Sequence, residues 1–277
     1  MKKTFLSAGA KQTYIDIGEG RPIVFLHPTP LDHSYWRPLV KELKGIRAIV
    51  PDLRGHGESE MGSDLPVGLF ARVPDAPVLT MERLAADVLT LLDALSIQKA
   101  VFVGCSIGGY VLPELWRQAP ARIEGLAFVC SKAQPDAEAN RERRAVTIAQ
   151  ARAGGHQAIY DAMTQTLIGA TARAKRPEIV AEMRAHMTLS AEELVAVQAG
   201  LATRPDSLPT ISTITVPVLA ICGGEDGGVT APEMRAFEAA PGGCAFHLIE
   251  DAGHFAAYEQ PQTVVRHLAE WLLTEVR

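Results

Sequence analysis

The segment Gly104-Cys105-Ser106-Ile107-Gly108 carries the residue types best suited to catalysis. The apolar run at residues 100–103 predicts a buried strand before it, and near-helical spacing at 107–116 predicts a helix after it. In a G-x-S-x-G turn between strand and helix, the serine has a strained backbone and other chain segments pass close to the glycines. We expect the Ser106 hydroxyl to project from the sheet, with the Ile107 amide at the positive helix N-terminus.

A serine alone is a poor nucleophile. It needs a base that takes its proton near neutral pH, usually a histidine, and an acid that orients this base. Four of the expected strands are followed by suitable residues, namely Thr29, Ser106, Asp226 and His254. Ligands and catalysts in open parallel sheets gather at the carboxyl ends of the strands. The chain order Ser…Asp…His is the order expected when the serine lies on such a turn.

The elements that must position these residues alternate between strands and helices. Strands are expected at residues 5–6, 13–17, 23–26, 48–50, 100–103, 125–129, 216–222 and 245–249. Helices are expected at residues 36–43, 81–95, 107–116, 231–239 and 262–273. This alternation predicts an α/β fold, with a mostly parallel sheet of roughly eight strands and helices on both faces.

The alternation stops between the sixth and seventh expected strands. Residues 134–208 show no strand pattern, and their alanine-rich, charged stretches at 138–153 and 191–201 predict helices. We therefore expect an α/β core made of residues 1–133 and 209–277, with a helical cap at 134–208 over the carboxyl edge of the sheet. A second irregular segment, residues 60–80, contains three prolines and predicts a long loop.

The amino-acid composition and the charge argue against several classes of partner. Of the 277 residues, 47% are hydrophobic, which is enough for a large core, and the formal net charge is −5 without a basic cluster. We therefore expect no nucleic-acid partner. No apolar run is long enough to cross a bilayer, and the N-terminal apolar stretch is too short for a signal peptide, so we expect a cytoplasmic protein with no membrane partner. The oligomeric state has no signature in this sequence.

The cysteines indicate neither disulfides nor a metal site. Three of the four, Cys105, Cys130 and Cys222, end apolar runs, which is typical of small buried residues in a cytosolic protein. Cys244 is the fourth. Neither C-x-x-C nor H-E-x-x-H spacing occurs, so a metal ligand set is not predicted.

Five motifs together resemble the α/β-hydrolase fold over nearly the whole chain. They are Phe25-Leu26-His27, Asp52-Leu53-Arg54-Gly55-His56-Gly57, Gly104-Cys105-Ser106-Ile107-Gly108-Gly109, Gly224-Glu225-Asp226 and Ala252-Gly253-His254. The resemblance implies that Ser106 is the nucleophile, Asp226 the orienting acid and His254 the general base. It also implies that the amides of Thr29 and Ile107 are the oxyanion donors. The short capped branch with carboxylesterases and 3-oxoadipate enol-lactonases is the most similar.

The chain departs from the family pattern in one loop. Most relatives have glycine after the histidine of the first motif, whereas Pro28 follows His27 here. Proline fixes φ and donates no hydrogen bond, so the position of the Thr29 amide is left open. The Thr29 hydroxyl is a candidate for a further substrate contact.

Several residues compete with these assignments. Glu225 and Asp251 are alternatives to Asp226, although Asp226 fits the family spacing best and Glu225 is expected to face solvent. The histidines of the first two motifs, His27 and His56, are interpreted as residues that hold loops. Cys105 lies beside the apex of the turn, and we expect it to pack inside.

The resemblance implies a serine hydrolase that cleaves carboxylic esters through an acyl-serine intermediate, without a metal or organic cofactor. The expected partner is a small-molecule ester or lactone. Methionines of the cap, Met163, Met183 and Met187, predict an apolar cavity and hence small or medium, largely apolar substrates.

Alternatives remain within and outside this class. The first is a lactone hydrolase of the 3-oxoadipate enol-lactonase type, and the same triad serves carbon–carbon bond hydrolysis, perhydrolysis and lyase chemistry. A ligand-binding signalling protein that retains the triad is an alternative of a different class. Dehalogenases and epoxide hydrolases of this fold have aspartate at the nucleophile position, so Ser106 counts against them.

Overall fold

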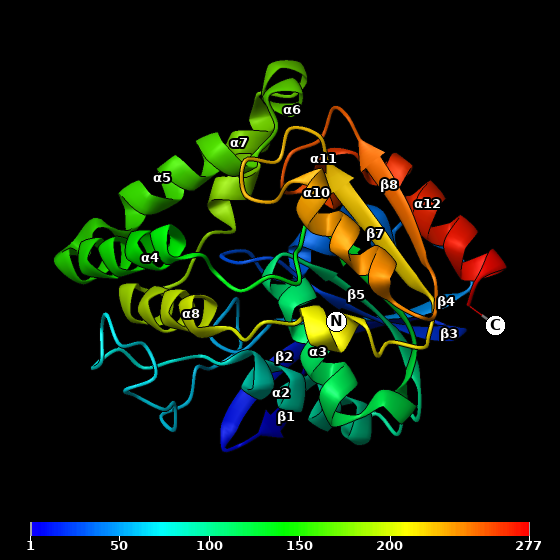
Figure 1. Cartoon of the computed structure of the whole chain (residues 1–277), viewed down its shortest axis with the longest axis horizontal. Helices are drawn as coiled ribbons and strands as arrows, with labels where there is room; N and C mark the ends of the chain where they lie inside the picture. The colour runs from blue at the N-terminus through cyan, green and yellow to red at the C-terminus, as the bar shows by residue number, and fades with distance from the viewer. Residues whose placement is uncertain (1, 277) are drawn as a thin grey trace.

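The computed structural model describes residues 2–276, which form one eight-stranded sheet flanked by helices (Figure 1). The strands are β1 (Lys2–Ser7), β2 (Ala10–Gly18), β3 (Arg21–Leu26), β4 (Ile46–Pro51), β5 (Ala100–Cys105), β6 (Ile123–Val129), β7 (Val218–Gly223) and β8 (Cys244–Ile249). Their spatial order is β1-β2-β4-β3-β5-β6-β7-β8. The pairs β1/β2 and β2/β4 are antiparallel, and all other pairs are parallel. The predicted α/β fold with a mostly parallel sheet is therefore confirmed.

Helices cover the sheet on both faces, as predicted. The core helices are η1 (His33–Trp36), α1 (Arg37–Val40), α2 (Met81–Ala94), α3 (Ile107–Gln118), η2 (Pro120–Arg122), α9 (Leu208–Ile211), α10 (Ala231–Met234), η4 (Arg235–Ala239), α11 (Ala256–Glu259) and α12 (Pro261–Thr274). Helices α1, α11 and α12 contact one another, and α2, α3 and α9 form a second group. Figure 1 shows α3 in front of the sheet and α12 behind β8. Because of this double cover, β5 is buried along its whole length.

A helical segment separates β6 from β7. It contains α4 (Glu138–Gln150), η3 (Ala151–Gly155), α5 (His156–Leu167), α6 (Ala170–Lys175), α7 (Glu178–Ala185) and α8 (Ala191–Thr203). In Figure 1, α4, α5, α7 and α8 lie to the left, and α6 lies at the top of the molecule. The helices expected at 138–153 and 191–201 are thus present. Whether residues 134–208 form a separate cap on a core of residues 1–133 and 209–277 stays a prediction.

The expected loop lies directly against this helical segment. Residues 52–80 contain neither helix nor strand. The Leu79 amide donates to the carbonyl of Ala196 in α8, at 3.1 Å. A Cβ added to Gly200 would lie 1.9 Å from the Leu79 carbonyl oxygen, so α8 packs on the loop backbone itself.

None of the helices within residues 2–276 combines the length and the apolar character that a membrane-crossing helix needs.

The turn at Ser106 has the strained geometry that its glycines predict. Ser106 has φ 51° and ψ −117°, which side-chain-bearing residues rarely adopt. A Cβ on Gly104 would lie 2.4 Å from the backbone of Gly108. A Cβ on Gly108 would lie 2.2 Å from the carbonyl oxygen of Leu26, the last residue of β3. The two glycines therefore allow α3 to start directly against the central strands.

We predict that Gly108→Ala destabilises the protein by more than about 3 kcal/mol, because backbone atoms would have to move to admit the methyl group. Gly68→Ala is the matched control. Gly68 has φ +82° but open space around its Cβ position, so alanine there should cost only about 1–2 kcal/mol. Urea unfolding of both variants measures the difference. Equal destabilisation would contradict the close-packing argument.

Candidate active site

The four predicted strand-end residues lie at one edge of the sheet. Thr29, Ser106, Asp226 and His254 follow β3, β5, β7 and β8, which run parallel, so their carboxyl ends share this edge. Ser106 is 7% exposed and His254 is 5% exposed. The serine is thus nearly excluded from water but retains access from one side.

His254 and Asp226 are in direct contact. The imidazole Nδ1 lies 2.8 Å from Asp226 Oδ2. The other carboxylate oxygen accepts hydrogen bonds from the amides of Gly228 and Val229, at 2.7 and 3.1 Å. The Asp226 side chain has no exposed surface, so these contacts determine its orientation. A carboxylate that accepts from Nδ1–H leaves the lone pair of Nε2 available for a proton.

Ser106 lies beside the turn that carries His254. The thiol of Cys105, next to the serine, donates to the His254 carbonyl at 3.6 Å, and the Cys130 thiol donates to the Gly253 carbonyl at 3.5 Å. Within residues 2–276, no hydrogen bond joins the Ser106 hydroxyl to the imidazole. Catalytic hydrogen bonds are often long without substrate and shorten in the complex. The serine–histidine pair therefore stays a prediction, whereas Cys105 packs inside as expected.

Glu259 anchors the His254 turn and was missed in the sequence. It is 5% exposed and accepts hydrogen bonds of 2.8 to 3.0 Å from three backbone amides, those of Gly169, Gly253 and Phe255. Burial raises the pKa of the Glu259 carboxyl, and the three amides oppose this rise. The His254 amide in turn donates to the Leu167 carbonyl at 2.8 Å. The His254 turn is thus bound to the helical segment. In the sequence, the signal for Glu259 was a single acidic residue after the short apolar run that follows His254.

Glu225 and Asp251, the two alternatives to Asp226, make contacts with other residues. Glu225 accepts from the amide and the hydroxyl of Thr171 at the start of α6, at 2.8 and 2.5 Å. The expectation that Glu225 faces solvent holds only in part, because the side chain is half-buried and ties the carboxyl end of the sheet to the helical segment. Asp251 is about half exposed and lies 3.8 Å from Lys175 Nζ. Neither carboxylate forms a hydrogen bond to His254 within residues 2–276.

The histidines of the first two motifs hold loops, as predicted. His27 Nε2 accepts from the Leu53 amide at 2.9 Å. His56 Nδ1 lies 3.0 Å from the Arg54 carbonyl, and its Nε2 lies 2.9 Å from the Thr29 hydroxyl. Burial lowers the pKa of His27, and it lowers the pKa of His56 to about 3, so both rings are neutral at pH 7.

These hydrogen bonds determine which groups of Thr29 are available to a substrate at the carboxyl end of the sheet. Neutral His56 donates from Nδ1 to a carbonyl, so its Nε2 accepts the proton of the Thr29 hydroxyl. The hydroxyl proton is therefore engaged, and only the lone pairs of its oxygen are free for a substrate contact, which stays a prediction. The backbone amides of Thr29 and Ile107 have no acceptor within residues 2–276, and Ile107 begins α3, where such donors are unpaired.

One cluster has the composition of a metal site. Ligand atoms of Asp32, His33 and Asp52 lie within 4.8 Å of one another. Asp52 accepts from the His33 ring and amide at 2.7 and 2.8 Å, and from the Glu58 amide at 3.1 Å. These internal donors account for the carboxylate oxygens, so the cluster holds two loops together.

A cavity of about 360 Å³ lies beside the edge. Its lining includes Tyr110, one helical turn after Ser106, and Gly228, whose added Cβ would lie 3.6 Å from His254 Nδ1. Of the three methionines behind the predicted apolar cavity, only Met163 lines this one. Met183 and Met187 are 0% and 2% exposed and pack within the helical segment.

The chain is similar to known proteins in both sequence and structure. A sequence model of the alpha/beta hydrolase family matches residues 23–267. A thermophilic esterase from Thermogutta terrifontis is 31% identical, with a TM-score of 0.87 over 99% of this chain and 97% of the esterase. An enol-lactonase from Burkholderia xenovorans LB400 is 27% identical, with a TM-score of 0.85 over 98% of this chain and all of that one.

One curated relative matches over a shorter region. A 3-oxoadipate enol-lactonase from Acinetobacter baylyi is 39% identical over 95 residues. These residues are 34% of this chain, and the chain covers only 30% of that relative.

We predict that Glu259→Ala lowers the free energy of unfolding by at least about 2 kcal/mol, because each buried donor left without an acceptor costs about 1–3 kcal/mol. Exposed Glu250, four residues before His254, is the matched control, and Glu250→Ala should change stability by less than about 0.5 kcal/mol. Chemical denaturation distinguishes the two. Similar values for both variants would show that Glu259 does not anchor the turn.

The low pKa of His56 predicts acid sensitivity. Between pH 6.5 and about 3, the unfolded chain protonates this histidine and the folded chain does not, so stability falls as the pH falls. His56→Gln removes this proton uptake. Its free energy of unfolding should decrease less between pH 6.5 and 4 than that of the wild type, even if it is lower at pH 7. Parallel pH profiles of the two proteins would be the contrary result.

Proposed function

This chain belongs to the alpha/beta hydrolase family, and on that premise we propose that it cleaves carboxylic esters through an acyl-serine intermediate. The contact between His254 and Asp226 beside the strained Ser106 turn carries the proposal. The similarity to the thermophilic esterase supports it. The proposed substrates are small or medium in size and largely apolar. Ile159, Met163 and Leu167 of the cavity lining support this, although most of the other lining side chains are polar or charged.

In the proposed mechanism, His254 takes the proton of the Ser106 hydroxyl through Nε2, and the serine oxygen attacks the ester carbonyl. Asp226 holds the ring through Nδ1 and stabilises the imidazolium that forms. His254 then gives the proton to the leaving alcohol. Water, deprotonated by the same imidazole, attacks the acyl-serine. The bond to the serine oxygen breaks, His254 returns the proton to that oxygen, and the acid is released.

The amides of Thr29 and Ile107 are the proposed oxyanion donors. Neither amide has an acceptor among residues 2–276, and Ile107 lies at the positive end of the α3 dipole. A donor of this kind typically lowers the barrier by about 2.7–4 kcal/mol. Pro28 has no amide proton, so the Thr29 amide is the proposed oxyanion donor from this loop.

Residues 134–208 are proposed to form a cap over the core. The segment leaves the sheet after β6 and returns before β7. Its contacts with the carboxyl end of the sheet include the Leu167 carbonyl, which accepts from His254, the Gly169 amide, which donates to Glu259, and Thr171, which binds Glu225. The cap thereby borders the side from which substrate must reach Ser106.

Lactone hydrolysis is the second candidate. A lactone is a cyclic ester, and the same attack by Ser106 would open it. The structural similarity to the Burkholderia enol-lactonase over its full length favours this candidate.

We predict that Ser106→Ala lowers kcat/KM for 4-nitrophenyl acetate and butyrate by at least about 10³-fold. Ser212→Ala, which changes an exposed serine, should leave the rate unchanged. A panel of esters, lactones and thioesters, assayed by product analysis, distinguishes the two candidates. Full activity in Ser106→Ala would refute the mechanism, and ligand binding without turnover would favour the signalling alternative.

We also predict that Asp226→Asn lowers kcat by roughly 10⁴-fold, because an amide no longer stabilises the imidazolium or selects the tautomer. Asp251→Asn serves as the matched control and should retain the wild-type rate. A larger loss in Asp251→Asn than in Asp226→Asn would reassign the orienting acid.

A further inference from the structure

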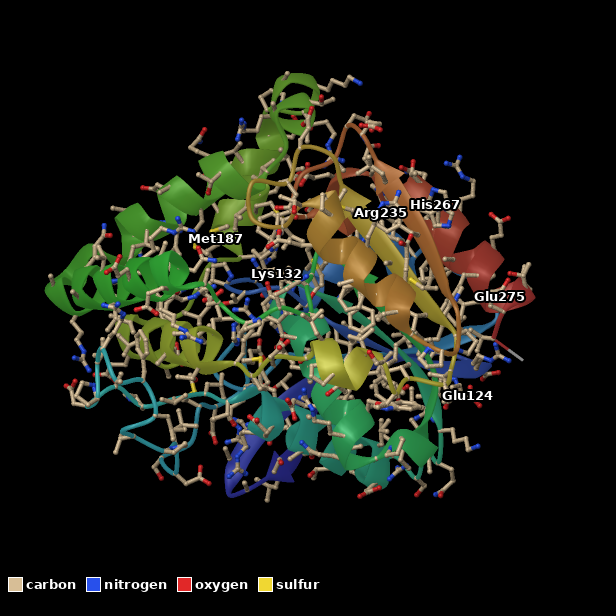
Figure 2. The ribbon with its side chains drawn as sticks, in the orientation of Figure 1. Glu124, Lys132, Met187, Arg235, His267 and Glu275 are labelled. Carbon is tan, nitrogen blue, oxygen red and sulfur yellow. The ribbon has the colours of Figure 1, made fainter. Side chains whose placement is uncertain are left out.

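The segment that follows β6 contains a buried hydroxyl beside the Ser106 turn. Ser131 lies just beyond Val129, the last residue of β6, and just before Lys132. Figure 2 shows Lys132 near the middle of the molecule, whereas Glu124, toward the other end of β6, lies at the lower right. Ser131 is 0% exposed. A fully buried hydroxyl needs a hydrogen-bond partner, and that partner indicates what the hydroxyl does.

This segment binds both backbone polar groups of Ser106. The Ser106 amide donates to the Val129 carbonyl, and the Ser131 hydroxyl donates to the Ser106 carbonyl, both at 3.1 Å. A carbonyl oxygen only accepts, so the direction of the second hydrogen bond is fixed. Cys130, between the two partners, has φ 45°, which residues with a side chain rarely adopt. Strained residues therefore lie on both sides of this contact, and such residues persist only where the surrounding structure holds them.

The Ser131 hydrogen bond acts on one torsion angle of Ser106. The angle ψ of Ser106, −117°, sets the direction of its carbonyl. The peptide unit that joins Ser106 to Ile107 is planar and trans, so its C=O and N–H point in opposite directions. A rotation of the carbonyl would therefore turn the Ile107 amide by the same angle. The carbonyl also accepts from the Tyr110 amide of α3, at 3.0 Å, and among residues 2–276 Ser131 is its one donor from outside that helix.

A glycine of α3 makes room for this hydrogen bond. A Cβ added to Gly109 would lie 2.4 Å from the Ser131 oxygen and 2.5 Å from the Ser131 Cβ. Any side chain at position 109 would thus displace the Ser131 hydroxyl from the first turn of α3. This gives a physical reason for the glycine that follows the G-x-S-x-G pattern, which the sharp turn between β5 and α3 does not itself require.

Resting on the proposed ester hydrolysis, we propose that Ser131 is a positioning residue for the oxyanion donor Ile107. Its hydroxyl holds the Ser106 carbonyl and thereby aims the Ile107 amide at the carbonyl oxygen of the substrate. The same hydrogen bond polarises the peptide unit and makes its N–H a stronger donor. A donor held in place before the substrate arrives needs no reorganisation during the reaction, which is what makes oxyanion stabilisation effective.

The kinetics of Ser131→Ala test this role. The substitution removes the hydroxyl and keeps the Cβ that packs on Gly109. We expect kcat for 4-nitrophenyl butyrate to fall about tenfold, less than the roughly 10²–10³-fold loss of a whole oxyanion donor, with KM changed by less than about twofold. The pH profile should keep its wild-type midpoint, because the contact between His254 and Asp226 is untouched. Ser131→Cys retains a weak donor, so its kcat should lie between the two.

Ser59→Ala is the matched control. Ser59 is 4% exposed, and its hydroxyl also donates to a backbone carbonyl, that of Asp52, at 2.7 Å. Its loss should lower the stability of the protein to a similar extent, because a buried carbonyl again loses a donor, but kcat should stay at the wild-type value. Equal losses of kcat in Ser59→Ala and Ser131→Ala would overturn the positioning role, and so would an unchanged kcat in Ser131→Ala.

A second measurement needs no catalysis. A hydrogen bond to the carbonyl of a peptide unit deshields the nitrogen of that unit, so the amide nitrogen resonance of Ile107 should move upfield in Ser131→Ala and stay in place in Ser59→Ala. Ser131→Cys serves for both measurements if Ser131→Ala does not fold.

The outcomes separate this inference from the proposed function. If hydrolysis depends on Ser106 while Ser131→Ala changes neither kcat nor the Ile107 resonance, the positioning role fails and the proposed function stands. If the wild type hydrolyses no ester, the proposed function fails and the resonance alone decides. A shift in Ser131→Ala then supports the orientation of Ile107 by Ser131, and an unchanged resonance refutes it.

Discussion

The close approach of α3 to the central strands is the constraint on which the site depends. Gly108 packs on the carbonyl of Leu26 with no room for a Cβ, and this contact requires a turn with no connecting loop between β5 and α3. Ser106 lies at that turn and takes the strained conformation. The same geometry leaves the Ile107 amide unpaired beside the serine, so one packing contact positions both a hydroxyl and a donor.

The opposite side of the site is positioned by buried polar groups. Glu259 binds amides on both sides of His254 and a third amide in the helical segment. Glu225, next to Asp226, binds the start of α6. The turns that carry the imidazole and its acid are therefore attached to the helices above them. A movement of those helices would displace the His254 turn unless these hydrogen bonds broke, which couples access to the cavity with the geometry of the His254–Asp226 pair.

Charged side chains near the cavity are also held in place by buried contacts. Asp136 is buried between Arg144 and Arg204, and Arg204 also stacks on the Tyr110 ring at 4.4 Å. These contacts fix the direction of the Arg144 guanidinium toward the lining. The overall charge of −5 gave no indication of this buried group of charged side chains.

The sequence by itself determined the sheet, the Ser106 turn and the order of the strand-end residues, because these depend on local patterns of period two and 3.6 and on glycine spacing. It also separated Asp226 from Asp251, through family spacing. Only the tertiary structure decided the role of Glu259, the attachment of Glu225 to α6, the proton donated by the Thr29 hydroxyl, and the pairing of Arg144 with Asp136. These depend on contacts between residues up to 90 positions apart, such as Gly169 and Glu259, and no local pattern records which distant donors and acceptors meet.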